Sequence, residues 1–285
     1  MRSFFTFLSL FTLLFFLAPI LCLGIPIESG EAPPPLQIPE QILQGGEHVA
    51  TADLILGALG AMDVRGYHAE ALKAAAVVAA TQVATRYRET GCGDGIATVT
   101  PQQAKEAWGD YWFSQYWPQM QAAVRETWGE ILTNANGDVF EASVFRLSWG
   151  KTEIGVECPL DETAEGYEST VRVPLQEFVA VFPEYASSFS VKNAQSGRVE
   201  TVTSGKTKLS GSEVMQRFSL PSPAFTVSIT STAATFRCRG QGNGVGMSLY
   251  GANERAKQGA DYREILKEFY PDARLQETNR GLGSK

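Results

Sequence analysis

Apolar residues recur at helical spacing in several stretches of the chain. Residues 52–62 and 69–88 repeat Leu, Ala or Val at every third or fourth position, which predicts two helices with apolar faces. A third helix is expected over residues 100–108, because threonine caps a helix start and the following proline fits the first turn. Residues 261–273 predict a last helix, stopped by Pro271.

Strand-like runs fill much of the middle of the chain. Residues 130–148 predict a β-hairpin, since Asn136-Gly137 suits a turn with positive φ and β-branched or aromatic residues flank it. Several short runs of this kind follow between residues 190 and 240, and a glycine-rich loop spans residues 240–246. Helices and antiparallel strands mix without β-α-β alternation, so we expect an α+β fold: a single domain of two lobes.

An uncharged, apolar run opens the chain. Arg2 precedes residues 3–27, which are rich in Phe and Leu. About twenty apolar helical residues span the roughly 30 Å hydrocarbon core of a membrane. We expect residues 1–27 to be an uncleaved signal anchor; a cleaved signal peptide and a lipid-modified Cys22 are the alternatives. Each would place the remaining chain on the extracytoplasmic side, membrane-anchored or secreted.

A proline-rich stretch follows this segment. Residues 28–46 contain three consecutive prolines and end in two glycines, which is typical of a semi-rigid linker. No break in composition appears from residue 47 onward, so residues 47–285 are assigned to the folded domain.

The charge and the cysteines of the chain limit which ligands and disulfides can be expected. The formal charge of −7 and the absence of a Lys/Arg cluster argue against nucleic acid, whose phosphates need a basic face. The cysteines are Cys22, Cys92, Cys158 and Cys238, and their wide spacing matches no zinc motif. In an oxidising space two of the last three could form a disulfide, without preference for a pair. We expect no cofactor.

Three segments together carry a family resemblance. They are residues 69–81 (AEALKAAAVVAAT), 124–153 and 240–271, the last with the runs GVGMS, YGA and EILKEFYP. In this order and spacing they resemble the SpoIID/LytB family of sporulation and amidase-enhancer proteins, over residues 49–271. The resemblance implies a substrate groove, peptidoglycan glycan strands as ligand, and a cell-wall amidase or another membrane complex as partner. It also implies a lytic transglycosylase activity, in which a carboxylic acid protonates the glycosidic oxygen.

The position of that acid is altered in this chain. The family has a Glu in an A-A-E-M-P stretch, and an ungapped comparison places Met62 there. Methionine has no proton to give and fills apolar space. The next residue, Asp63, is the candidate replacement, although one residue along a helix turns the side chain by about 100°. The alternative is that Asp63 only caps the end of the helix.

Other positions of the family motifs have also changed. The Arg and Tyr of A-R-T-Y-A correspond to Ala80 and Gln82, and the Gln of the final signature corresponds to Leu249. Its His is replaced by Asn243. Some members bind zinc through residues in the strand before a G-x-T-E run. At those positions this chain has Phe145, Ser148 and Lys151, so no metal site is supported.

Polar residues of the last signature remain as groove candidates. We predict that Asn243, Gly244, Ser248 and Tyr250 line the substrate groove, with Ser248 and Tyr250 contacting sugar. Packing within the loop is the equally weighted alternative.

Several residues are assigned structural roles instead. Glu70 and Lys73 lie one helical turn apart and are expected to form an ion pair. His48 and His68 are expected at the surface. The tryptophans are expected in the core: Trp108, Trp112, Trp117, Trp128 and Trp149.

The sequence leaves three candidate functions. The preferred one is a protein that binds glycan strands or an amidase in cell-wall remodelling after loss of the catalytic Glu. The second is an active, divergent lytic transglycosylase that uses Asp63. The third is a purely structural scaffold whose groove binds protein.

Overall fold

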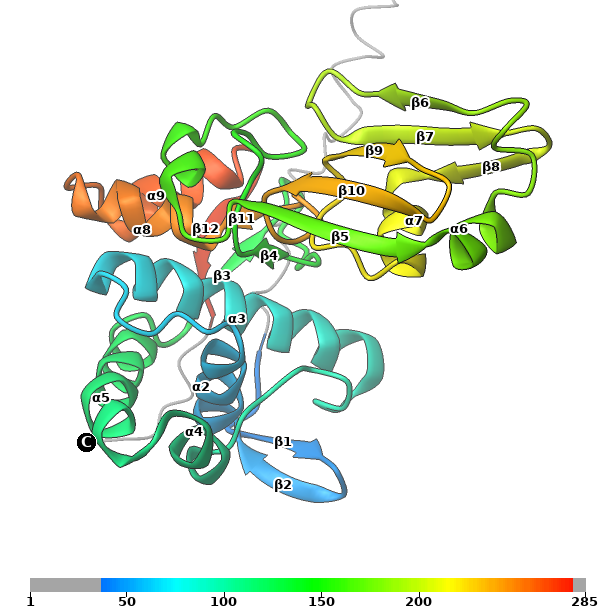
Figure 1. The fold of residues 1–285 in the computed structure, drawn as a ribbon. Helices are drawn as coiled ribbons and strands as arrows, with labels where there is room; N and C mark the ends of the chain where they lie inside the picture. Colours follow the sequence, from blue (N-terminus) through cyan, green and yellow to red (C-terminus); the bar gives the residue numbers. More distant parts are fainter. Residues whose placement is uncertain (1–36, 279–285) are drawn as a thin grey trace, which may run out of the picture. The chain divides into compact units, whose positions relative to one another are not determined.

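The structure is a computed structural model that describes residues 37–278. Helices and several small sheets are mixed along this range (Figure 1), which confirms the expected α+β class. No helix within residues 37–278 is both long enough and apolar enough to span a membrane. The predicted membrane segment, residues 1–27, lies outside the described residues, as does linker segment 28–36.

The four expected helices are present, whereas α5, α6, α7 and α8 were not predicted. Those expected at 52–62, 69–88, 100–108 and 261–273 are α2, α3, α4 and α9, each within a few residues. The helices are α2 (Thr51–Ala61), α3 (Ala69–Thr90), α4 (Pro101–Trp108), α5 (Asp110–Glu126), α6 (Leu175–Val181), α7 (Gly211–Arg217), α8 (Leu249–Lys257) and α9 (Tyr262–Phe269), with a 3-10 turn η1 (Pro159–Thr163).

The strands form short sheets of two or three members. The strands are β1 (Gln41–Gln44), β2 (Glu47–Ala50), β3 (Glu130–Thr133), β4 (Val144–Phe145), β5 (Glu168–Pro174), β6 (Ser190–Asn193), β7 (Val199–Ser204), β8 (Thr207–Ser210), β9 (Phe225–Ile229), β10 (Ala233–Arg239), β11 (Met247–Ser248) and β12 (Arg274–Glu277).

Helix α3 is the centre of one hydrophobic cluster, which we call the helical cluster. It contacts α2, α5, α8, α9 and β3. Its buried positions are mostly alanine and valine, so neighbouring backbones approach it closely. Because α3 is surrounded on most sides, residues from both ends of the chain meet on it (Figure 1).

A second hydrophobic cluster lies in residues 168–239, and we call it the phenylalanine cluster. The antiparallel sheets β5-β10-β9 and β6-β7-β8 contribute to it, together with α6 and α7. Phe178 is fully buried, and its ring centroid lies 5.2 Å from Phe182 and 6.0 Å from Phe218. The strand runs expected between residues 190 and 240 are therefore present and supply this core.

The hairpin predicted over residues 130–148 is only partly formed. Its turn exists, with Gly137 at a φ of 82° and a bridge between Thr133 and Val139. Beyond that bridge the two arms separate: β3 pairs with β12 in antiparallel fashion, and β4 pairs with β11 in parallel. The prediction was wrong here because the C-terminal segments offer partners that local sequence does not reveal.

The cysteines of the described range are free thiols. These are Cys92, Cys158 and Cys238. Cys158 is buried in the helical cluster and Cys238 in the phenylalanine cluster, so these two belong to different cores. Burial raises the pKa of each of these two thiols to about 11, which makes them unreactive. The disulfide that an oxidising space would allow is thus not formed among these three residues.

Candidate functional site

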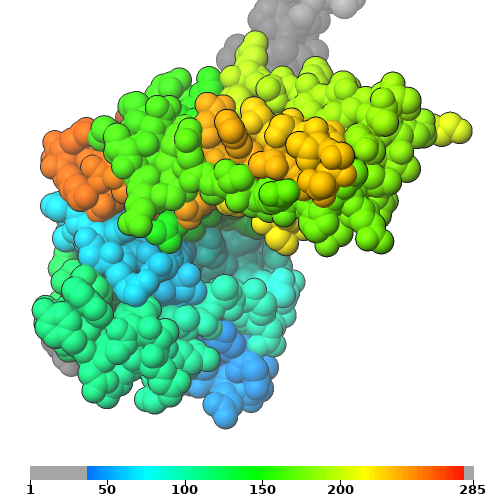
Figure 2. Space-filling model, viewed as in Figure 1, coloured from blue at the N-terminus to red at the C-terminus, as the bar shows by residue number. Residues whose placement is uncertain are grey.

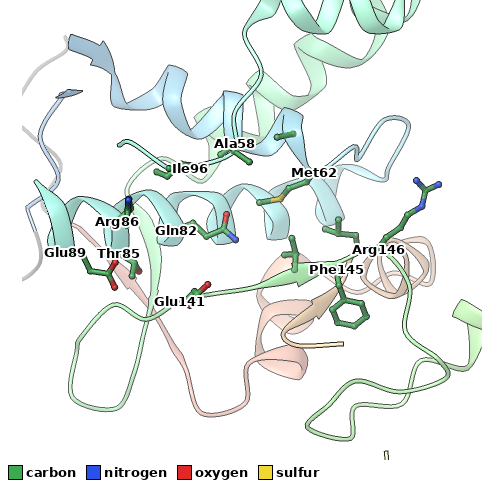
Figure 3. A pocket seen from close by; sticks show the side chains of 15 residues that line it. Ala58, Met62, Gln82, Thr85, Arg86, Glu89, Ile96, Glu141, Phe145 and Arg146 are labelled. Carbon is green, nitrogen blue, oxygen red and sulfur yellow. The ribbon is translucent and has the colours of Figure 1, made fainter. Parts of the chain in front are cut away.

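A cavity of about 700 Å³ opens beside the helical cluster, and we call it the Met62 pocket. Four separate stretches of chain meet around it: the end of α2, the C-terminal half of α3, the loop at 95–97 and the segment at 141–146 (Figure 3). Leu249, at the start of α8, completes its wall. The lining residues are Ala58, Ala61, Met62, Gln82, Thr85, Arg86, Glu89, Gly95, Ile96, Ala97, Glu141, Val144, Phe145, Arg146 and Leu249.

Three altered motif positions converge on this pocket. Met62, Gln82 and Leu249 are the residues that stand where the family resemblance expects Glu, Tyr and Gln. They are far apart in sequence, yet all three line the same cavity. Two of the three are apolar, so this wall offers van der Waals contact where the family pattern has proton donors and acceptors.

Hydrogen bonds join two of the stretches around the pocket, α3 and the segment at 140–142. The Gln82 Nε2 donates to the carbonyl oxygen of Ala142 at 2.7 Å, and the Thr85 hydroxyl donates to that of Phe140 at 2.9 Å. These two bonds attach the 140–142 segment to α3. This side of the pocket is therefore held in place on α3.

The charged residues of the pocket were not identified from the sequence. Arg86, Glu89, Glu141 and Arg146 all line it, and Figure 3 shows Glu141 below Gln82 and Arg146 beyond Met62. Arg86 is held by its Nε, which donates to the carbonyl oxygen of Asp94 at 2.6 Å. No local motif marks these residues, since they come together only in the folded chain. Two cations and two carboxylates give the pocket polar groups of both signs.

Asp63 does not line the Met62 pocket. It follows α2 with a φ of 53°, a left-handed conformation that aspartate tolerates better than most residues. Its Oδ1 accepts a bond from the Nε of Arg65 at 2.5 Å, and its Oδ2 lies 3.7 Å from Arg146. The side chain is 44% exposed. The Asp63 carboxylate thus takes part in ion pairs outside the pocket lining, and Arg146 connects it to the rim of the pocket.

The groove candidates of the last signature also lie outside the pocket lining. Asn243 is exposed, and its side-chain oxygen accepts a bond from the backbone of Val245. Gly244 has a φ of 77° and packs on Trp149, whose ring leaves no room for an added Cβ. Tyr250 is half-buried. The loop thus supports the packing alternative at Gly244.

Ser248 is fully buried and serves the fold. Its hydroxyl donates to Asp161 Oδ2 at 2.7 Å and accepts from the backbone N–H of Gly251, which caps α8. The same Asp161 oxygen accepts the N–H of Ser148 at 2.6 Å. Burial raises the pKa of Asp161, and the bonds from Ser248 and Ser148 partly offset that effect. The expected contact between Ser248 and sugar does not fit this position, because both functions of its hydroxyl are used internally.

The expected ion pair and surface histidines are found. Lys73 Nζ lies 2.8 Å from Glu70 and 2.9 Å from Glu126, so it links α3 to α5. Both histidines are exposed. Of the tryptophans, Trp117 and Trp149 are buried as expected, whereas Trp112 and Trp128 are exposed. Within residues 37–278, no group of three or more His, Cys, Asp or Glu side chains is placed to hold a metal ion.

Comparison with known proteins supports the resemblance to sporulation proteins. Residues 43–134, which include Met62 and Gln82, match the family model described as SpoIID, Stage II sporulation protein. Stage II sporulation protein D of Bacillus amyloliquefaciens is 27% identical over 267 residues, which cover 83% of this chain and 77% of that protein. Its counterpart in Bacillus subtilis (strain 168) is 26% identical over 269 residues, covering 84% and 78%. The chain is therefore similar to the SpoIID family over residues 43–134, and to these two sporulation proteins over most of its length.

Proposed function

We propose that this chain is a sporulation-related cell-wall protein that binds peptidoglycan glycan strands in the Met62 pocket and does not cleave them. The convergence of Met62, Gln82 and Leu249 on one cavity is the observation that carries the proposal. A site inherited from an enzyme would keep its shape while losing the chemistry of these positions. The related sporulation proteins support the biological setting.

The composition of the pocket suits a sugar polymer. Apolar residues such as Met62 and Ile96, which are only partly buried, can contact the C–H faces of sugar rings, while Gln82 and the charged groups can bond hydroxyls and amides. A volume of about 700 Å³ lies within the range of ligand pockets, about 300–1,000 Å³. Peptidoglycan strands offer both kinds of group along their length.

An active enzyme that uses Asp63 is the second candidate. Its support is the 3.7 Å approach of Arg146, a pocket residue, to the Asp63 carboxylate. A general acid must come within hydrogen-bond reach of the glycosidic oxygen, at about 2.6–3.2 Å. Asp63 is instead bonded to Arg65 outside the pocket lining, so the loop after α2 would have to rearrange before it could act.

A binding experiment tests the proposal. The full chain would be titrated with soluble glycan strands freed of stem peptides, in parallel with Ala61→Trp. Ala61 is exposed at the end of α2 and lines the pocket, so the indole would fill the cavity beside Met62. Ala186→Trp is the matched control, because Ala186 is exposed in the other part of the domain.

The expected result is binding by the wild type and the control, with at least a tenfold loss in Ala61→Trp, about 1.4 kcal/mol. Equal binding by all three proteins would place the glycan elsewhere and contradict the proposal. An absence of binding by the wild type, with capture of a purified cell-wall amidase instead, would favour the protein scaffold. Unfolding curves would verify that both tryptophan variants are folded.

A further inference from the structure

Helix α5 presents aromatic side chains to solvent, although its other face is buried. Tyr111 is 66% exposed and Trp112 is 47% exposed, whereas Trp117 is only 4% exposed. The Trp112 and Tyr116 rings stack with their centroids 5.3 Å apart and their planes within 2°. Tyr111 meets Trp112 edge-on at 4.9 Å. We call these three residues the aromatic platform; α4 and α5 contribute to the face seen at the lower left of Figure 2.

The platform is ordered by its own packing and by the loop before α3. Residues 112 and 116 are four apart, so they project from the same side of α5. The Tyr116 ring lies against Gly66, where an added Cβ would be 3.5 Å away. Stacked rings held in this way lose little freedom when a flat ligand covers them.

Two ion pairs extend from the rim of the Met62 pocket toward the platform. Arg146 lines the pocket and lies 3.7 Å from Asp63, and Asp63 is bonded to Arg65. The Arg65 guanidinium then lies 5.5 Å from the ring centre of Trp108, at the end of α4. Gly66, the next residue after Arg65, touches Tyr116. Hydrogen-bonding groups therefore run from the rim of the pocket to the aromatic rings.

From this continuity we infer that the aromatic platform is a second binding site for the same polysaccharide strand that enters the Met62 pocket. Ring faces of Tyr111 and Trp112 cover the C–H faces of sugar units, and the Asp63–Arg65 pair bonds hydroxyl groups between the two sites. The inference rests on the proposed function. It adds that the protein recognises a strand several sugars long and not a single disaccharide.

Strand length is the variable that tests the inference. The full chain would be titrated with a disaccharide, a tetrasaccharide and an octasaccharide of the peptidoglycan glycan backbone, by calorimetry. The double variant Tyr111→Ala/Trp112→Ala removes the platform. Trp128→Ala is the matched control, since Trp128 is 40% exposed and follows the C-terminal end of α5, whereas Tyr111 and Trp112 lie at its N-terminal end.

The wild type and Trp128→Ala should bind the octasaccharide more tightly than the disaccharide. The double variant should bind the octasaccharide about five- to tenfold more weakly than the wild type, with the disaccharide affinity unchanged. Thermal unfolding of both variants would show that they are folded, which is expected because the altered rings are exposed.

Other outcomes separate the two proposals. Glycan binding that is unchanged by the double substitution at every length overturns the platform and leaves the pocket proposal standing. An equal loss at every length also overturns it, because the substitution would then act on the pocket or the fold. A wild type that binds no oligosaccharide overturns the proposed function, and the platform with it.

Discussion

The two hydrophobic clusters of this chain are built from different residues. The helical cluster is formed around α3, whose buried side chains are mainly alanine and valine. The phenylalanine cluster is filled by large rings that contact one another, with Phe178 at their centre. Small residues bring backbones together but leave space where elements diverge, whereas interlocking rings fill their volume.

The Met62 pocket and a second cavity lie beside the helical cluster. The Met62 pocket is lined by α2, α3 and segments that pack beside them. A smaller cavity, about 280 Å³, lies next to it around Phe269 and Tyr270 and shares Glu141. Both cavities belong to the helical part of the domain. The phenylalanine cluster is thus expected to supply stability, and the helical cluster to supply the ligand site.

The largest expected effect comes from the phenylalanine cluster. Phe178→Ala should lower the free energy of unfolding by about 3–5 kcal/mol, because a fully buried ring leaves a cavity among its neighbours. Denaturant unfolding would measure this loss. Glycan affinity per folded molecule should stay at the wild-type value. A large change in affinity would contradict the expectation that the phenylalanine cluster supplies stability and the helical cluster supplies the ligand site.

A smaller effect is expected at Asp161, which joins the segments around Ser148 and Ser248. Asp161→Ala should cost about 1–3 kcal/mol, since a buried N–H and a hydroxyl lose their acceptor. The loss would again be measured by denaturant unfolding. A cost near zero would mean that these segments are held by packing alone.

The Asp161 carboxylate should make the stability of the folded protein depend on pH. Its pKa is raised in the folded protein, so the folded state binds this proton more tightly than the unfolded chain does. The stabilisation is complete below the ordinary aspartate pKa, about 3.9, and is lost as pH rises through the raised value. Asp161→Asn should therefore gain stability relative to the wild type as pH rises. A stability difference between Asp161→Asn and the wild type that does not vary with pH would contradict the raised pKa of Asp161.

The smallest effect is expected from the ion pairs of α3. Lys73→Met should cost no more than about 1 kcal/mol, because its partner Glu126 is half exposed and the methionine retains most of the aliphatic stem. A double-mutant cycle with Glu126→Gln would measure the coupling. A coupling of several kcal/mol would show that charge, and not alanine packing, holds α3 against α5.

Much of the helical architecture was predictable because its signals are local. The start of α4 is marked by Thr100 and Gln103, which form a reciprocal capping box. Asp261 and Glu264 do the same for α9. The pairing of β3 with β12 was not predictable, since it joins segments more than a hundred residues apart.

The candidate site was predictable only at its motif positions. Met62 was identified from the family pattern, and it lies on the pocket. Glu141 and Arg146 carry no local signal, because the fold alone brings them to the cavity. Ser248 was misplaced for the opposite reason: its residue type suits sugar binding, but burial against Asp161 commits it to the fold.

One measurement tests the central claim most directly: mass spectrometry of glycan strands after incubation with the full chain, Met62→Glu and Asp63→Asn. A pocket that binds glycan without cleaving it should give no anhydro-ended fragments with the wild type or Asp63→Asn. Met62→Glu should produce them, because it returns a proton donor to an intact pocket. Fragments from the wild type that disappear in Asp63→Asn would contradict the account and identify Asp63 as the acid.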